Sequence, residues 1–327
     1  MKKSEGVLIK TRMADGSALV KAAAKLVRDQ CHEAVQIASA PRRSVPASDD
    51  LLEFYRDFVG RSRPCVFKAK QCAGADAESL LKRDGIVKVS VTPNGRADAE
   101  CGGKFYLPAY EHVTVAELLD DLSCGGMKNN RILYASNQND CLRQEGAYEA
   151  MRDIGAVDEN SAFDEIFGAK ADARNIWIGD ARSVTSIHRD FYENVMYVCT
   201  GAKIVKLLPP SAVILLREAG LVKERETVQW VDTNKDGHWT EVPQDGLVEW
   251  VASDWECRLK EIFGIEPAVL TIHAGEALYL PCLWYHEVSN SETGITIALN
   301  SWWDMDFEGA AFRTLSSVEA AYEMKGA

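Results

Sequence analysis

The chain has 327 residues, of which 46% are hydrophobic and 26% are charged, and its formal net charge is -12. A chain of this length and apolar content can bury a large core, as one β-rich domain with additions or as two ordinary domains. The acidic balance disfavours nonspecific binding of nucleic acid, and no run of roughly 18 apolar residues supports membrane spanning or export. We therefore expect a cytoplasmic location, with a nuclear one left open.

The nine cysteines are scattered along the chain without a Cys-X-X-Cys pair. This spacing argues against a zinc ribbon, a thioredoxin-type motif and a dense disulfide framework. We interpret most of these cysteines as reduced side chains that pack in the interior.

The first predicted element is an amphipathic helix over residues 17–37, which begins at a potential cap, Ser17. The face that we expect to pack on the protein carries Leu19, Ala23, Leu26 and Val27. Residues 39–50 are rich in Pro, Ser and charge and predict a loop before a second helix at "LLEFYRDFV".

Strand and helix signals then alternate up to about residue 130. The stretch "IVKVSVTPNGRADA" has alternating apolar positions that end at Pro93, Asn94 and Gly95, which is typical of a strand that enters a turn. Helical periodicity returns at "TVAELLDDL".

Beyond residue 130 the chain consists mainly of short β-type runs. They are "RILYAS", "NIWIGD", "SVTSIH", "NVMYVCT", "AKIVKLLPP", "AVLTIHAG", "EALYLP", "YHEVSN" and "GITIALNSWW". Many short strands joined by tight turns predict a mainly β fold with flanking helices, built as a sandwich or barrel. An insertion at about residues 209–267 interrupts these strands with a helix-like "SAVILLREAG" and a predicted hairpin, "VQWVDTNKDGHWTEV".

A histidine and an aspartate lie two positions apart in "TSIHRDFYENV". Successive side chains of a strand point to opposite faces, so His188 and Asp190 are expected on one side and Arg189 on the other. Such a pair suits a metal ion, although an isolated His-X-Asp is common by chance.

A second motif, "GEALYLPCLWYHEVSN", strengthens the metal interpretation. Gly275, Pro281, His286 and Asn290 have the spacing of the second cupin signature, with Leu283 where a glycine is usual. The glycine closes a hairpin, the proline stiffens its exit, and the histidine begins the next strand facing into a barrel.

Together, His188, Asp190 and His286 supply two imidazoles and one carboxylate. This donor set can occupy one face of an octahedral iron(II) ion and leave three positions open. Zinc is the alternative metal for these donors. His273, two residues before Gly275, could also approach the ion, but we interpret it as a core histidine.

The stretches "TSIHRDFYENVMYVCTGAK" and "LYLPCLWYHEV" resemble the JmjC family of iron(II)- and 2-oxoglutarate-dependent oxygenases. The similarity extends to "FYRDFVGRSRPCV", "VTPNGRADA", "LYASNQ" and "LNSWWDMDF". It implies a double-stranded β-helix, a jelly-roll or cupin-like core of eight strands, with Fe(II), 2-oxoglutarate and O2 meeting at the open end of the barrel.

With this resemblance we divide the chain into four parts. Residues 1–130 form N-terminal helices and strands that pack on the core, and residues 131–305 form the JmjC double-stranded β-helix. The insertion at about 209–267 belongs to the core part, and residues 306–327 form a C-terminal helix.

The resemblance also assigns roles within a 2-oxoglutarate pocket. Lys203 matches the lysine whose ammonium pairs with the distal carboxylate of 2-oxoglutarate, and Thr185 matches the hydroxyl that shares this carboxylate. On spacing alone, Lys203 could equally be a solvated strand residue, like its neighbour Lys206 in "GAKIVK".

Further positions carry over with less specific roles. Asn194 and Tyr134 match polar positions that line the co-substrate pocket, and Asn300 matches an amide on the last core strand. Trp302 lies where the family has a residue over the site that faces the substrate. Met196 departs from the aromatic residue that relatives carry there, which leaves the preference for lysine open.

The resemblance implies hydroxylation of a protein side chain, with lysine of a translation-associated GTPase as the expected target. The alternatives are hydroxylation of a modified tRNA base, lysine demethylation, and a cupin without oxidative activity. At the C-terminus an apolar stripe at helical spacing either packs on the barrel or builds a homodimer. This stripe consists of Phe307, Ala311, Leu315, Val318 and Tyr322.

Overall fold

The structure is a computed structural model that describes residues 18–40, 43–44, 50–69, 77–125, 130–152, 159–291 and 294–323. The potential cap Ser17, the cysteine Cys72 and most of the predicted loop over 39–50 lie outside the described residues.

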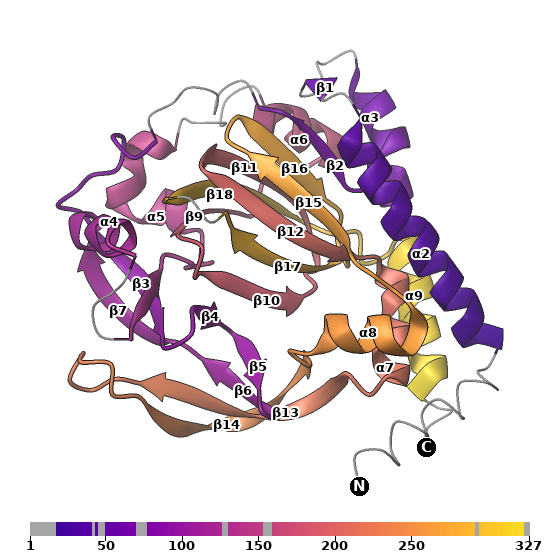
Figure 1. Cartoon of the computed structure of the whole chain (residues 1–327). Coiled ribbons are helices and arrows are strands. Elements are labelled where there is room, and N and C mark those ends of the chain that lie inside the picture. The colour runs from indigo at the N-terminus through magenta and orange to yellow at the C-terminus, as the bar shows by residue number, and fades with distance from the viewer. Residues whose placement is uncertain are drawn as a thin grey trace, which may run out of the picture.

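Two β-sheets form the centre of the molecule (Figure 1). The first has the order β1-β2-β16-β11-β18-β9 and the second the order β15-β12-β17-β10-β4. The first sheet comprises β1 (Arg43–Ser44), β2 (Cys65–Lys68), β16 (Glu276–Leu280), β11 (Tyr192–Thr200), β18 (Thr296–Asp304) and β9 (Ala173–Gly179). The second comprises β15 (Ala268–His273), β12 (Ala202–Leu208), β17 (Tyr285–Asn290), β10 (Val184–His188) and β4 (Arg96–Ala97).

The order of the eight strands from β9 to β12 and from β15 to β18 shows a double-stranded β-helix. Along the chain, β9, β11, β16 and β18 enter the first sheet, while β10, β12, β15 and β17 enter the second. These strands are antiparallel to their neighbours within the core. The predicted cupin-like fold is confirmed.

Burial patterns explain why these runs form strands. β18 is buried along all but its last residue, because it lies between β11 and β9 and both of its faces are covered. β15 alternates between buried and exposed positions, as expected at the edge of a sheet with one face on the core. β11 separates two cores, since Val195 and Tyr197 belong to one hydrophobic cluster and Met196 and Val198 to the other.

Helix α2 (Ala18–Ser39) packs along β15 and α7 and confirms the predicted first helix (Figure 1). Its buried face differs from the prediction, because Leu19 and Leu26 are 38% and 48% exposed. The contact is made by small and β-branched residues: Val20, Ala23, Ala24, Val27, Cys31, Ala34 and Ala38. Small side chains let the helix approach closely, so the larger leucines lie at the margin of the contact.

The N-terminal elements confirm the predicted second helix, strand and third helix. Helix α3 (Leu51–Asp57) buries Leu51 and Phe54. The small sheet β7-β3-β8 consists of β3 (Ile86–Thr92), β7 (Ala109–Thr114) and β8 (Ile132–Tyr134). Helix α4 (Val115–Ser123) begins at a capping box, in which the Thr114 hydroxyl accepts from the Glu117 amide at 3.1 Å.

The insertion between β12 and β15 contains the predicted helix and hairpin. Helix α7 (Val213–Glu218) follows a 3₁₀ turn, η4 (Pro210–Ala212), and the hairpin pairs β13 (Val222–Val231) with β14 (Thr240–Val251). Helix α8 (Trp255–Phe263) was not predicted. The parallel pairing of β13 with β6 (Lys104–Leu107) was not predicted either. Together with β5 (Ala99–Cys101), these strands form the sheet β14-β13-β6-β5, which joins the insertion to the N-terminal part of the chain.

The C-terminal helix α9 (Ala310–Glu323) packs on the chain's own core. Leu315, Val318 and Tyr322 contact the hydrophobic cluster that α2, α7 and the barrel share. Phe307 precedes the helix and is 47% exposed, and the side chain of Ala311 lies outside the described residues. Three of the five stripe residues therefore pack on this shared cluster.

The described part of the chain also contains four short helical elements: η2 (Val59–Arg61), α5 (Cys141–Gln144), η3 (Gly146–Met151) and α6 (Glu159–Phe167). The eight described cysteines form no disulfide bond with one another, and four of them are buried. Among the described residues, no helix is both long enough and apolar enough to cross a membrane.

Candidate active site

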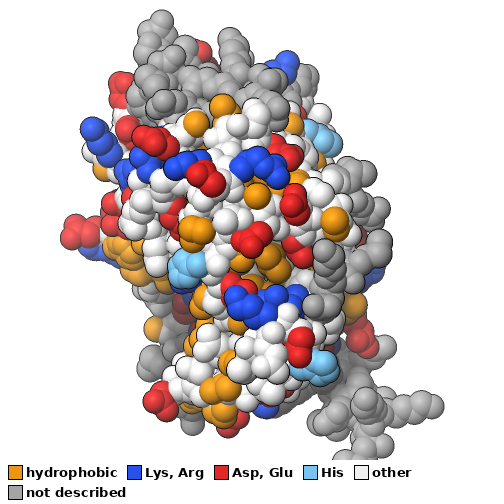
Figure 2. All heavy atoms as spheres, turned by 90° about the vertical axis from the view of Figure 1, so that its left-hand side faces the viewer, with side chains coloured by type: hydrophobic (Ala, Val, Ile, Leu, Met, Phe, Trp, Pro, Cys, Tyr) orange, Lys and Arg blue, Asp and Glu red, His pale blue; other side chains and the backbone are white. Residues whose placement is uncertain are grey.

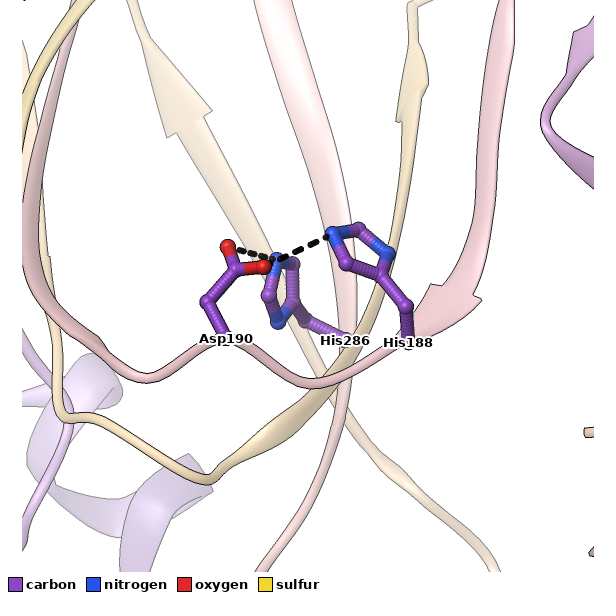
Figure 3. Close-up of side chains that lie close together, drawn as sticks. All are labelled: His188, Asp190 and His286. Atoms are coloured by element: carbon purple, nitrogen blue, oxygen red, sulfur yellow. Dashed lines mark ion pairs between the residues drawn. The ribbon is translucent and has the colours of Figure 1, made fainter. Parts of the chain in front are cut away.

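The three predicted metal ligands converge at one end of the barrel (Figure 3). His188 ends β10, and His286 is the second residue of β17, directly opposite His188 in the antiparallel register. One ligand atom from each of His188, Asp190 and His286 lies within 4.8 Å of the other two. The Nε2 atoms of the two histidines are each 3.6 Å from an oxygen of the Asp190 carboxylate.

Asp190 reaches this position differently from the sequence-based prediction. β10 ends at His188 and β11 begins at Tyr192, so Asp190 lies in the connection and not in a strand (Figure 3). Its carbonyl oxygen accepts from the Leu283 amide at 2.9 Å, which ties the connection to the turn before β17. Leu283 has a positive φ of 67°, which explains why a glycine is usual at this place in the signature.

Backbone contacts fix the orientation of both imidazoles. The Nδ1 atom of His188 lies 2.7 Å from the carbonyl oxygen of Ser186, and that of His286 lies 3.0 Å from the carbonyl oxygen of Trp284. A carbonyl can only accept, so each Nδ1 carries the proton and each Nε2 presents a lone pair to the centre of the group. Burial, followed by the neighbouring His188, lowers the pKa of His286, which favours the neutral, ligating form.

All nine residues predicted for the site line a single pocket next to this group. They are Tyr134, Thr185, His188, Asp190, Asn194, Lys203, His286, Asn300 and Trp302. The pocket extends between the two sheets from the His188 end toward the middle of β12. The structure thus brings together every residue that was singled out, while their chemical roles remain predictions.

Lys203 is the most unusual side chain of the pocket. It is 1% exposed, and its Nζ atom donates to the Tyr134 hydroxyl at 3.4 Å. Tyr134 in turn lies 3.4 Å from the hydroxyl of Thr185. Among the described residues no carboxylate pairs with Lys203, and burial lowers the pKa of its ammonium to about 7. A buried cation of this kind lacks an anion, and a carboxylate bound beside Tyr134 and Thr185 would supply it.

The other end of the pocket also presents unsatisfied polar atoms. Within the described part of the chain, the Oδ1 atom of Asn194 and the indole Nε1 of Trp302 are buried without a partner. The Oδ1 atom of Asn300 accepts from Trp177 at 3.2 Å. Trp302 stacks on Tyr192 with ring centroids 5.4 Å apart. Buried groups without partners are uncommon in folded proteins, so these atoms fit a polar molecule bound in the pocket.

Met196 lines the same pocket and is 8% exposed. The sequence placed it there as a departure from an aromatic residue. Its flexible thioether side chain leaves more space than a ring at this wall.

His273 does not belong to the site. It lies on β15, as predicted, but its side chain is exposed on the outer face of the barrel, so the interpretation as a core histidine was wrong. The alternation along β15 explains this, because Ile272 takes the inward position.

Sequence reasoning missed Trp250, which lies at the end of β14 in the insertion. Its indole is parallel to the His188 ring within 10°, with the ring centroids 6.1 Å apart. It also contacts Phe105 of β6. No local signal marks this residue, because its place beside His188 depends on contacts between distant segments, such as the parallel pairing of β13 with β6.

Comparison with known proteins agrees with the fold and the donor set. The model of the cupin-like domain matches residues 51–309. The lysine-specific demethylase JMJ32 of Arabidopsis thaliana is 34% identical to this protein, in an alignment that covers 79% of this chain and 80% of the JMJ32 chain. The bifunctional peptidase and (3S)-lysyl hydroxylase JMJD7 of Homo sapiens is 30% identical over 83% of this chain and 87% of its own. JmjC domain-containing protein E of Dictyostelium discoideum is 30% identical, in an alignment that covers 78% of this chain and 82% of the relative.

The chain therefore belongs to the JmjC family of cupin-like oxygenases. Enzymes of this family depend on iron(II) and 2-oxoglutarate. The resemblance found in the sequence is confirmed.

Proposed function

We propose that this oxygenase hydroxylates a lysine side chain of a protein, with a translation-associated GTPase as its substrate. The main observation that supports the oxygenase chemistry is that Lys203, which is buried and has no carboxylate partner among the described residues, lies in the same pocket as the His-Asp-His group. The choice of lysyl hydroxylation is supported by the relative JMJD7, which is named a (3S)-lysyl hydroxylase.

In this proposal His188, Asp190 and His286 hold iron(II). Two neutral imidazoles and one carboxylate suit this ion and leave coordination positions for other ligands. Iron(II), together with 2-oxoglutarate and O2, supplies the oxidising power that inserts oxygen into a C–H bond while 2-oxoglutarate is converted to succinate and CO2.

The chain's own residues bind and orient the reactants. Lys203 pairs with the distal carboxylate of 2-oxoglutarate, and Thr185 and Tyr134 donate hydrogen bonds to it. Asn194 and Asn300 supply amide groups along the pocket wall. The pocket lies inside the barrel between the two sheets, so bound co-substrate is shielded from water.

Trp302 is proposed to contact the substrate side chain. It is 7% exposed and lines the pocket next to the strand that carries Asn194. The departure at Met196, on the same strand as Asn194, widens the space in which the target side chain has to fit.

The net charge of -12 supports a basic protein target, because an acidic protein attracts basic segments over distances of about a Debye length. Figure 2 shows acidic and basic side chains interspersed on the face that carries α4, β3 and β7, with hydrophobic side chains scattered between them. The attraction therefore comes from the excess of acidic residues over the whole chain and not from an acidic patch on that face.

Lysine demethylation is the second candidate, because the relative JMJ32 is named a lysine-specific demethylase. The same residues would serve both reactions, since hydroxylation of an N-methyl group leads to its loss as formaldehyde. The two differ only in which carbon of the substrate is held near the metal.

The experiment that separates these functions uses purified translation-associated GTPases in unmodified and in Nε-methyllysine form. We expect wild-type enzyme with iron(II) and 2-oxoglutarate to add the mass of one oxygen atom to a lysine of the unmodified protein. Loss of a methyl group from the methylated form, without oxidation of the unmodified one, would favour demethylation. The Asp190→Ala variant serves as the control, and an equal mass gain with it would contradict the assigned site.

We also propose that α9 contributes to a homodimer through surface that the barrel leaves uncovered. Phe307 and Phe312 lie near its start, and Phe307 is 47% exposed. Light scattering should give twice the monomer mass, and a monomeric mass would contradict the proposal.

A further inference from the structure

The position of Asp190 depends on contacts that the neighbouring strands β10 and β11 do not provide. It lies in the connection between β10 and β11, and within the described part of the chain its carboxylate pairs with the two histidines alone. His188 and His286, in contrast, are held by paired strands and by carbonyl oxygens at their Nδ1 atoms. Asp190 is therefore the ligand whose orientation is least determined by the barrel itself.

The residue before Asp190 is held by the C-terminal helix. The guanidinium of Arg189 forms a two-pronged ion pair with Glu319 of α9, with N–O distances of 2.6 and 3.3 Å. The same guanidinium lies 5.3 Å from the centre of the Tyr285 ring, and Tyr285 directly precedes His286. Both side chains of the ion pair are only 18% exposed, so solvent weakens the interaction less than it would on the surface.

The residue after Asp190 contacts the same C-terminal segment. The Phe191 ring lies 6.2 Å from the ring of Phe307 and 6.4 Å from that of Phe312. The Phe191 carbonyl oxygen accepts from the Met305 amide at 3.1 Å. The two neighbours of Asp190 are thus held on both sides by residues 305–319.

We infer that Phe307, Phe312 and Glu319, which we call the C-terminal clamp, position Asp190 for metal binding through Arg189 and Phe191. The helix that carries the clamp is itself anchored, because Leu315 and Val318 pack on the hydrophobic cluster shared by α2, α7 and the barrel, and the Tyr322 hydroxyl donates to Glu218 of α7. Glu319 is a positioning residue in this arrangement and does not touch the metal. The inference rests on the proposed metal site.

The test measures Mn²⁺ binding and thermal unfolding of the metal-free protein, and requires no protein substrate. Glu319→Gln removes the negative charge of residue 319 while keeping the size of the side chain. Arg189→Lys keeps the positive charge of residue 189 but cannot form the two-pronged ion pair. Arg313→Gln is the matched control, because Arg313 lies on the same helix with an exposed side chain. We expect the first two variants to weaken Mn²⁺ binding about tenfold, the lower end of the loss seen when a residue that contacts a metal ligand is removed, because here the effect reaches Asp190 through its neighbour Arg189. The control should bind Mn²⁺ like the wild type.

A purely structural role predicts a different pattern: a lower melting temperature with wild-type Mn²⁺ affinity, and this result would overturn the clamp. If the wild type itself bound no Mn²⁺, the proposed metal site and the clamp would both be wrong. The double variant Arg189→Lys/Glu319→Gln should have the same Mn²⁺ affinity as whichever single variant binds Mn²⁺ less tightly, because the two residues act as one pair. Should Glu319→Gln fail to fold, Phe312→Leu tests the other half of the clamp, with an expected loss of several-fold and contradiction by an unchanged affinity.

Discussion

The burial of Lys203 is the residue-scale observation that most strongly supports the proposed 2-oxoglutarate pocket. A fully buried ammonium without a carboxylate partner destabilises a protein, and natural sequences retain such a group where a ligand needs it. Its spacing from His188 agreed equally with a solvated strand lysine, so the sequence could not decide between the two. The structure shows that Lys203 is buried and not solvated, because β12 lies between β15 and β17 and directs this side chain toward the interior.

Replacing Lys203 should stabilise the metal-free protein while greatly weakening 2-oxoglutarate binding. The folded-state pKa of about 7 lies below the usual value of 10.5. Below pH 7 both states carry the proton and the full cost of the buried charge applies. As the pH rises from 7 toward 10.5, the folded protein is neutral and the cost diminishes. Lys203→Met should therefore raise the free energy of unfolding by on the order of 5 kcal/mol near pH 6.

Denaturant unfolding at two pH values checks this expectation, with Lys206→Met on the same strand as the control. Lys206 pairs with Glu256 and Glu287, so its loss should not stabilise the protein. A Lys203→Met variant less stable than the wild type at pH 6 would contradict the cost assigned to the buried ammonium.

The affinity for 2-oxoglutarate should also depend on pH through Lys203. Only the protonated lysine pairs with a carboxylate, and half of the free enzyme loses this proton near pH 7. The KM for 2-oxoglutarate should be constant below pH 7 and rise by up to tenfold per pH unit above it. Burial raises the pKa of Tyr134 to about 12, so the hydroxyl stays a donor over this range. Steady-state kinetics between about pH 6 and pH 9 measures the slope, and a KM that does not change would rule out this role of Lys203.

At the scale of elements, the metal motif was predictable because its parts are local. The strand that carries His188 and the hairpin that carries His286 are each marked by residues close in sequence, including Gly275 with its positive φ of 83°. Trp250 and the off-strand position of Asp190 were not predictable. Both depend on contacts between segments far apart in the chain, β13 with β6 and Asp190 with Leu283.

Gly95 couples the N-terminal sheet to β10, which carries Thr185 and His188. Its φ is 75°, its carbonyl accepts from the Val184 amide, and a Cβ atom there would lie 1.9 Å from the carbonyl oxygen of Arg182. Gly95→Ala should therefore destabilise the protein by more than about 2 kcal/mol. Gly102→Ala is the control, since Gly102 has a φ of 59° with open space around it and should cost only about 1 kcal/mol. Equal losses in denaturant unfolding would contradict the close contact.

The hairpin of the insertion should support the metal site through Trp250. Trp250→Ala exposes one side of the His188 ring and should raise the iron(II) concentration needed for half-maximal succinate formation several-fold. Trp230→Ala, in the same hairpin but stacked on Tyr106, provides the control and should leave this concentration unchanged. A similar iron requirement in both variants would show that the hairpin acts on stability alone.

At the scale of the whole molecule, the sequence indicated the fold class and the insertion because the β-type runs are regular and the family motifs are spaced like those of relatives. The buried face of α2 was predicted less well, since helical periodicity does not show that Ala and Val, and not Leu, face the contact. The role of the C-terminal helix was also not readable from its apolar stripe, because Glu319 acts through an ion pair with a residue 130 positions away.

The central claim is that His188, Asp190, His286 and Lys203 form one site for iron(II) and 2-oxoglutarate. The most direct measurement is the formation of succinate from 2-oxoglutarate by purified protein supplied with iron(II) and O2. We expect succinate from the wild type, none above background from Asp190→Ala, and a greatly raised KM for 2-oxoglutarate in Lys203→Met. Equal succinate formation by the wild type and Asp190→Ala would contradict the account.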